Sequence, residues 1–245
     1  MEELKVDKPL GIESIANYEG NWSEVLFSRL QNPVIRQQLI ALLFQLQSKD
    51  AKYKTEEEIA MELEENLTLA MSKTDISFQD PVRPPNANSI NLLWENPSTG
   101  KKLNPRQLSM IEAHEKGHKI RSFRSLTSWK YFSSGFDTSK IIFTPEDFEK
   151  YKKASRRKGK VSQEEFKIGY INYLFSGNEI IERMSQLKNY FGMKGSEIFT
   201  KENLAYAREH YLDDVGLDNC MKHFLQAITE ETEARFLSLI NNSGV

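Results

Sequence analysis

The five-residue segment His-Glu-Lys-Gly-His at 114–118 constrains this chain more than any other part of its sequence. It matches the pattern H-E-x-x-H. On a helix, residues four apart lie one turn apart on the same face, so His114 and His118 can both reach a single zinc ion. Glu115 would project beside the metal, where it can take a proton from a bound water and pass it to a leaving amine. We therefore expect a helix here, carrying two metal ligands and a general base.

The surrounding sequence supports a helix through this segment. Asn104 and Pro105 stand where a helix N-cap and a first helical residue are expected, and the segment lies inside the helix that they would start. Gly117 opposes a helix, because a glycine in a helix interior costs about 1 kcal/mol relative to alanine. A residue this small also allows another part of the chain to approach the helix closely.

A zinc ion held by two histidines needs a third protein ligand, with the fourth position left for water. Glu179 is the best candidate, because it falls in the first turn of an expected helix. Its alternative role is to stabilise the N-terminus of that helix through its charge. Glu182 is an alternative ligand on the same helix, although with Arg183 it could equally form an exposed charged pair. The remaining histidines, His210 and His223, are further candidates.

The combination of His114-Glu115-x-x-His118 with a later Asn178-Glu179 resembles the gluzincin branch of the zincin metallopeptidases, in which a glutamate on a second helix completes the zinc site. The segment 179–183 is also similar to small zincin-like proteins encoded by bacteriophages. The resemblance covers about 90–190. It implies a zincin-like core, Zn²⁺ as the cofactor, and a zinc-dependent metallopeptidase that hydrolyses peptide or protein substrates. The implied ligands are His114, His118 and Glu179, with Glu115 as the general base and acid.

The sequence departs from the gluzincin pattern in two ways. Glu112, Lys116 and Lys119 are charged, whereas peptidases of this kind prefer uncharged residues around the histidines. Many gluzincins place an aspartate four residues after the ligand glutamate, where it can hydrogen-bond a zinc-bound histidine, but Arg183 stands at that position. Another carboxylate, Glu112 or Glu182, would have to orient the imidazole. These departures keep a second hypothesis open: a non-catalytic structural or assembly protein, for example a phage virion component, that retains a zincin-like fold.

Peptide hydrolysis also needs a hydrogen-bond donor for the oxyanion. The chemically suitable side chains are His210, Tyr211, Tyr206 and His223, all in the expected C-terminal helices. For His210 a polar surface position on an amphipathic helix is the stronger interpretation, and for His223 a packed helix face. The sequence does not choose among these donors.

Helix signals outnumber strand signals along the rest of the chain. Residues 34–47 repeat apolar side chains at helical spacing, and Thr55 with Glu58 forms a capping box for a second helix, so the two predict a helical hairpin. Ile90–Trp94 and Ile141–Phe143 are expected strands. With the resemblance, this pattern predicts an α+β fold that is mainly helical: a zincin-like core with the H-E-x-x-H helix, a small antiparallel sheet and added N- and C-terminal helices.

The proline-rich segment 79–89 is the best candidate for a domain boundary. We expect an N-terminal helical region at 1–80, which starts with a polar lead-in at 1–20 and whose helices could contact partners in a protein assembly. Residues 81–245 would form a zincin-like metallopeptidase domain with a C-terminal helical subdomain. A basic, solvated loop is expected at 154–160.

Composition excludes several classes of protein. The chain has 33 Lys and Arg against 35 Asp and Glu, a formal net charge of −2, so no dedicated nucleic-acid binding is expected. No apolar run approaches the roughly 18 residues that span a bilayer, and the N-terminal sequence lacks the pattern of a signal peptide. A single cysteine excludes an intrachain disulfide. We therefore expect a protein without membrane partners, located in the cytoplasm (the host cytoplasm or the virion if the protein is phage-encoded).

Overall fold

The computed structural model describes residues 21–47, 54–72, 75–78, 89–92, 99–121, 129–148 and 162–245; at 75–78, 89–92 and 129–130 it describes the backbone alone. Three expected features lie outside the described residues: the polar lead-in at 1–20, the boundary segment except for Ser89, and the basic loop at 154–160.

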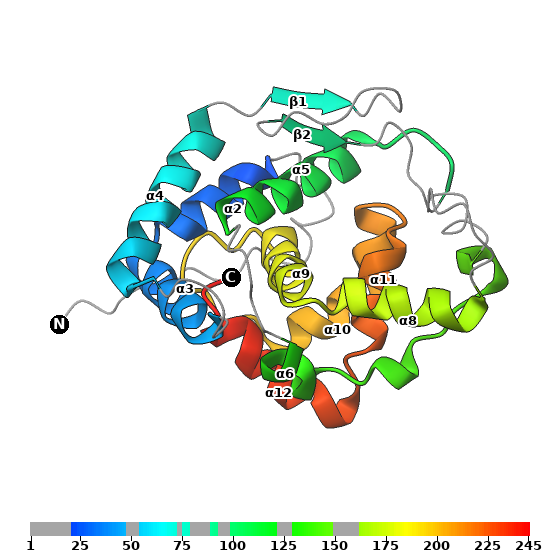
Figure 1. The fold of residues 1–245 in the computed structure, drawn as a ribbon. Helices are drawn as coiled ribbons and strands as arrows, with labels where there is room; N and C mark the ends of the chain where they lie inside the picture. The colour runs from blue at the N-terminus through cyan, green and yellow to red at the C-terminus, as the bar shows by residue number, and fades with distance from the viewer. Residues whose placement is uncertain are drawn as a thin grey trace.

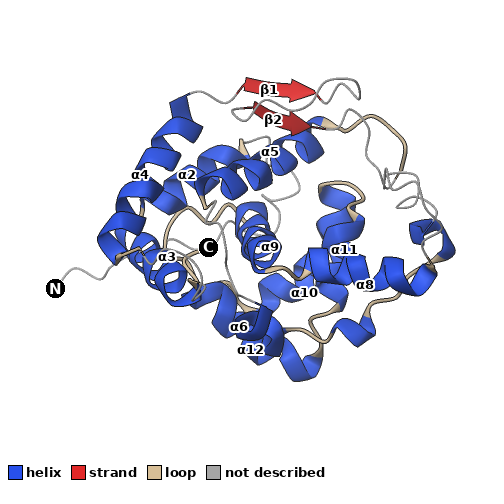
Figure 2. Cartoon of the chain, viewed as in Figure 1, coloured by secondary structure: helices blue, strands red, loops and turns tan. Residues whose placement is uncertain are grey.

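The described residues form the ten α-helices named below, a helical segment at 145–148, two short 3₁₀ helices and two short strands (Figures 1 and 2). In chain order the elements are α2 (Trp22–Gln31), α3 (Pro33–Leu46), α4 (Glu56–Ser72), β1 (Asp75–Phe78), β2 (Ser89–Leu92), α5 (Pro105–Ile120), α6 (Trp129–Phe132), η1 (Ser133–Gly135), η2 (Thr138–Lys140), α8 (Gln163–Leu174), α9 (Gly177–Tyr190), α10 (Lys201–Asp214), α11 (Asn219–Gln226) and α12 (Glu230–Asn242). Among these helices, none combines the length and the apolar character that crossing a bilayer requires.

The helix-start signals of the sequence are confirmed. The Asn32 side chain caps α3 ahead of Pro33. Thr55 and Glu58 exchange the two hydrogen bonds of a capping box at the start of α4. A side-chain acceptor at these positions satisfies backbone N–H groups that have no partner inside the helix. α3 and α4 pack against one another, as the expected helical hairpin requires.

The fold class expected from the sequence is wrong. Within the described residues, β1 and β2 are the only strands, each has four residues, and they pair in parallel rather than antiparallel. Zincin-like cores contain a sheet, so this almost entirely helical fold also contradicts the resemblance to gluzincins and to phage zincin-like proteins.

The segment 141–143 shows why the sheet was overestimated. Ile141 is buried against the core, but Ile142 is 67% exposed and its N–H donates to the side chain of Gln226. The segment is an irregular connection that follows η2; Ile141 is buried in the core, and Phe143 is partly buried and packs against it. Apolar residues in so short a run do not distinguish a strand from a loop that is anchored in this way.

α9 lies at the centre of the molecule, with α2 and α5 on one side and α6 and α8 also in contact with it (Figure 1). Thirteen of its fourteen residues are buried, including seven polar or charged ones. Because buried polar groups need partners inside the protein, the charged residues of α9 must either pair with residues of the surrounding elements or lose their charge.

The apolar core has two parts. The larger cluster contains side chains from α2, α3, α5 and the elements from α6 to the C-terminus, and the smaller one contains side chains of α2, α3 and α4 together with Ile120. Helices of the expected N-terminal region, 1–80, therefore share apolar packing with helices much later in the chain. This packing holds α2 against both α5 and α9.

Candidate metal centre

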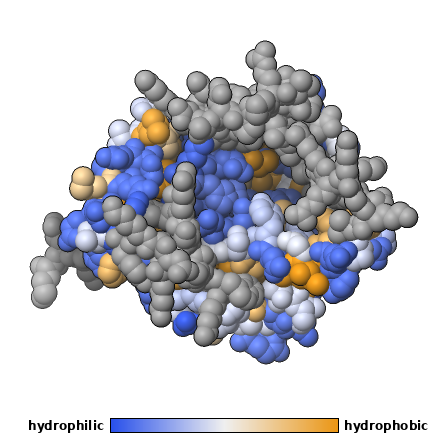
Figure 3. Space-filling view, in the orientation of Figure 1, coloured by the Kyte–Doolittle hydropathy of each residue, from blue (hydrophilic) through white to orange (hydrophobic). Residues whose placement is uncertain are grey.

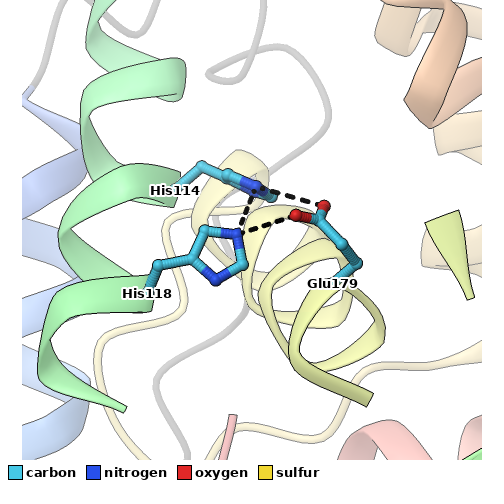
Figure 4. Close-up of side chains that lie close together, drawn as sticks. All are labelled: His114, His118 and Glu179. Carbon is cyan, nitrogen blue, oxygen red and sulfur yellow. Dashed lines mark hydrogen bonds and ion pairs between the residues drawn. The ribbon is translucent and has the colours of Figure 1, made fainter. Parts of the chain in front are cut away.

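α5 presents two histidines to the same side. Its first turn is fixed by a capping box, in which the Gln107 N–H donates to Asn104 Oδ1 at 2.7 Å and the Asn104 N–H donates to Gln107 Oε1 at 3.0 Å. Further along the helix, His114 and His118 lie one turn apart, and their Nε2 atoms are 3.1 Å from each other (Figure 4). The helix predicted from Asn104 and the H-E-x-x-H spacing is confirmed.

α9 brings Glu179 to the histidine pair. Glu179 is in the first turn of α9, and its carboxylate points at both imidazoles (Figure 4). Oε1 lies 3.0 Å from His118 Nε2 and Oε2 lies 3.5 Å from His114 Nε2. The structure thus brings together the three residues predicted as metal ligands, and donor atoms of all three lie within 4.8 Å of one another.

The spacing of these atoms fits a zinc ion. Ligands arranged tetrahedrally at the usual zinc distances of about 2.0–2.1 Å lie roughly 3.3 Å from one another. The two Nε2 atoms are 3.1 Å apart, and each has a different oxygen of Glu179 near it, Oε1 at 3.0 Å from His118 and Oε2 at 3.5 Å from His114. Oε2 of Glu179 is buried, and its basic neighbours His114 Nε2 and Arg183 Nη2 are each 3.5 Å away. A hydrogen bond between the two Nε2 atoms would require a proton on one of them, whereas a metal ion accepts a lone pair from both. Two imidazoles and a carboxylate are also a usual zinc donor set.

The charges at this site favour an ionised carboxylate. Burial by itself would raise the pKa of Glu179, but hydrogen bonds from His114 and His118 and the charge of Arg183 lower it well below its ordinary value. Burial would likewise lower the pKa of His118, but the hydrogen bond to Glu179 and the charges of Glu182 and Glu115 raise it above its ordinary value. The ionised carboxylate of Glu179 therefore faces two imidazoles, and these groups together can bind a cation.

Glu115, the predicted general base, is half-buried on α5 next to His114. It is outside the group of three convergent side chains. Its charge nevertheless acts on both His118 and Lys119: it contributes to the raised pKa of His118, and it opposes the burial that lowers the pKa of Lys119. It therefore lies beside the candidate site, as the H-E-x-x-H pattern requires of a base that is not itself a ligand.

Glu182, the alternative ligand, forms an ion pair with Arg121 instead of joining the two histidines. Its carboxylate accepts two hydrogen bonds from Arg121, Nε to Oε1 and Nη2 to Oε2, each 2.8 Å long. Glu182 is 2% exposed and Arg183 is 7% exposed, so the exposed charged pair considered for them is wrong. Arg183 reaches Oε2 of Glu179 at 3.5 Å on one side and Asp218 Oδ2 at 3.2 Å on the other.

The two carboxylates considered for orienting an imidazole both form ion pairs with basic side chains instead. Glu112 pairs with Lys116 one turn further along α5, and Glu182 pairs with Arg121. Nδ1 of His114 is buried and has no hydrogen-bond partner among the described residues. The structure therefore provides a carboxylate for the third ligand position but not for this imidazole nitrogen.

The expected oxyanion donors make contacts with residues other than the candidate ligands. The Tyr211 hydroxyl is fully buried and hydrogen-bonded to Gln186. His210 packs on the ring of Tyr206, 4.3 Å between centroids. His223 is fully buried against Tyr170. Neither His210 nor His223 belongs to the group formed by the candidate ligands.

Tyr173 is the neighbour of the site that sequence reasoning missed. It is in the last turn of α8 and 51% exposed. Partial burial and the charge of Glu179 raise the pKa of Tyr173 far above its ordinary value. The turn between α8 and α9 brings the two side chains together. No spacing rule within one helix would have indicated this contact, because the residues are on different helices.

Comparisons of the chain with models of known protein families, with curated proteins and with solved structures found no match. The case for a metal centre consequently rests on the geometry and chemistry of the side chains themselves. Hydrophilic residues gather near the centre of the face shown in Figure 3, around α5 and α9.

Proposed function

We propose that this protein binds one zinc ion through His114, His118 and Glu179 and uses it to hydrolyse peptide bonds. The convergence of the two Nε2 atoms and the Glu179 carboxylate, with separations of 3.0–3.5 Å, carries the proposal. With three protein ligands among the described residues, one position of a tetrahedral ion is left open, as in catalytic zinc sites. His118, whose side chain is 25% exposed, is the most accessible of the three.

Each residue has a chemical role in this proposal. A bound zinc ion supplies Lewis acidity, which lowers the pKa of a water molecule to near neutrality and polarises a carbonyl. Glu115 takes a proton from the attacking water and delivers it to the leaving amine. The Tyr173 phenol, kept protonated beside Glu179, donates a hydrogen bond to the oxyanion that develops on the substrate. The positive charge of Arg183, which also pairs with Asp218, favours the ionised form of Glu179.

Burial favours a second candidate function, a structural zinc site in a non-catalytic assembly protein. The side chains of His114 and Glu179 are only 6% and 8% exposed, and structural zinc sites are typically closed. In that case the ion would hold α5 to α9 and would contribute to folding rather than to turnover.

Metal analysis tests the part that both functions share. The chain, purified without a polyhistidine tag, should contain about one zinc per molecule, and His114→Ala should lose it. Zinc added to the metal-free chain should raise its Tm, because a ligand that binds only the folded state stabilises that state. A chain without zinc, whose Tm neither zinc nor His114→Ala changes, would contradict both functions.

Glu115→Gln then separates the two functions. The variant should retain zinc, because Glu115 is not among the convergent ligands, while cleavage of a peptide library should fall by about two to four orders of magnitude. Unchanged cleavage would show that the assignment of Glu115 is wrong. Zinc binding by the wild type without cleavage of any peptide would favour the structural function.

A further inference from the structure

A buried ion pair joins α5 to α9 next to the candidate metal centre. Arg121 directly follows α5, and its guanidinium donates two parallel hydrogen bonds to the Glu182 carboxylate, each 2.8 Å long. Both residues are nearly inaccessible, Arg121 at 3% and Glu182 at 2% exposure. A bidentate pair of this kind fixes the direction as well as the distance between its partners.

This pair joins α5 to α9, as the contact between His118 and Glu179 also does. Arg121 comes three residues after His118, and Glu182 comes three residues after Glu179. Three residues correspond to roughly 4.5 Å along a helix. The Arg121–Glu182 pair therefore links the same two helices as His118 and Glu179, about one turn further along each of them.

Gly117 makes room for this pair between the two histidines. A β-carbon at position 117 would lie 1.9 Å from Glu182 Oε2 and 2.9 Å from Arg121 Nη2. Real β-carbons do not approach other atoms so closely, so any other residue would displace the pair. A glycine inside the H-E-x-x-H helix is otherwise unfavourable, and the approach of Glu182 accounts for it.

The pair is also tied to a third helix. Arg121 Nη2 donates to Ser185 Oγ at 3.0 Å, and the same hydroxyl oxygen lies 2.8 Å from Nη2 of Arg29 on α2. Nη1 of Arg29 also donates a hydrogen bond of 2.8 Å to the carbonyl oxygen of Met193, just beyond the end of α9. Directional hydrogen bonds thus connect α2, α5 and α9, whereas apolar contacts alone would allow these helices to slide.

We propose that the Arg121–Glu182 pair, seated over Gly117, is a positioning device for the metal centre: it sets how far α9 lies along α5 and so holds the Glu179 carboxylate at the two imidazoles. This inference rests on the metal site proposed above. Arg121 and Glu182 touch neither metal nor substrate in it; they act on metal binding through the placement of Glu179.

Replacing the pair by apolar residues separates positioning from stability. The double variant Arg121→Met/Glu182→Leu removes both charges of the pair together, and such exchanges are often neutral or stabilising. We expect this variant to unfold at a denaturant midpoint close to that of the wild type, but to bind zinc about 10- to 100-fold more weakly, the range observed when partners that orient metal ligands are lost. With Co²⁺ as the probe, its visible absorption spectrum should also change, because the ligand geometry changes.

Gly117→Ala is the second test, and Gly169→Ala is its matched control. Gly169 is an exposed residue of α8, and a β-carbon there would have no atom within 4 Å. Gly117→Ala should weaken zinc binding and alter the Co²⁺ spectrum, whereas Gly169→Ala should change neither. A folded double variant that binds zinc with wild-type affinity and an unchanged Co²⁺ spectrum would overturn the positioning role. A wild-type chain that binds neither metal would instead overturn the proposed metal centre.

Discussion

Nδ1 of His223 lies 2.9 Å from the hydroxyl oxygen of Tyr170, and this contact connects α11 to α8 inside the core. His223 is fully buried, and its other nitrogen, Nε2, is 3.6 Å from Asp147 Oδ2. Burial lowers the pKa of His223 below its ordinary value, and Asp147 opposes this effect only in part. The imidazole is therefore held neutral in the folded protein more strongly than in the unfolded chain.

A loss of stability in mild acid follows from this shift. Below about pH 6.5 the unfolded chain binds a proton at His223 that the folded protein resists, so the free energy of unfolding falls until the lower, folded-state pKa is passed. His223→Gln should remove this part of the pH dependence. Urea unfolding of both proteins from pH 8 to pH 5 measures it. Parallel curves for the two proteins over this range would contradict the prediction.

Lys188 should make the protein more stable in mild base. It is 1% exposed on α9, and burial together with the charge of Arg29 lowers its pKa to about 7, although Glu197 acts in the opposite direction. The unfolded chain keeps this proton up to a pKa of 10.5, so the free energy of unfolding should rise with pH between 7 and 10.5.

Lys188→Met tests this prediction. At pH 7 the variant should be more stable than the wild type by a few kcal/mol, because about 1.4 kcal/mol corresponds to each unit of the pKa shift. The advantage should shrink as the pH is raised to 9, which chemical denaturation at each pH will show. A difference in the free energy of unfolding that does not change with pH would mean that folding does not lower the pKa of Lys188.

The local parts of the site were predictable from the sequence. Asn104 and Pro105 mark the start of α5, and residues four apart on a helix share a face, so the meeting of His114 and His118 follows from short-range geometry. Glu179 was recognisable because a first-turn glutamate on a later helix supplies the missing ligand type. These inferences need only helix geometry and the coordination preferences of zinc.

The long-range parts were not predictable. Burial of Glu182 depends on Arg121, which the fold brings from the end of a different helix. Arg183 is buried because Asp218, at the start of α11, accepts its hydrogen bond. Charged residues are exposed by default, so only tertiary packing reveals these pairs. The same limit applies to 141–143, where contact with the core rather than strand pairing fixes the chain.

Two glycines with the same backbone conformation should respond very differently to alanine. Gly100 and Gly244 both have φ of 65°. A β-carbon at Gly100 meets no atom within 4 Å, whereas one at Gly244 would lie 2.3 Å from the backbone nitrogen of Leu39 in α3. Gly100→Ala should therefore cost only about 1–2 kcal/mol, the strain of a left-handed alanine.

Gly244→Ala should cost more, because α3 must shift or the end of the chain must leave it. Val245, which is fully buried, would then be exposed, and burying such a side chain contributes about 1.5–3 kcal/mol. We expect a clearly larger loss in the free energy of unfolding than for Gly100→Ala. Equal losses in denaturant titrations would show that contact with α3 adds nothing to the conformational strain.

Tyr173→Phe tests the proposed oxyanion donor, and Tyr206→Phe is its control. The Tyr173 phenol is half-exposed beside Glu179, whereas the Tyr206 ring packs on His210. If Tyr173 donates to the developing oxyanion, its removal should lower kcat for peptide cleavage by about 10²–10³-fold. KM and zinc content should change little, since the missing bond forms in the transition state rather than on substrate or metal binding. Tyr206→Phe should leave kcat unchanged. A fall in zinc content in Tyr173→Phe equal to the fall in kcat would show that the phenol supports Glu179 as a ligand and does not act on the substrate.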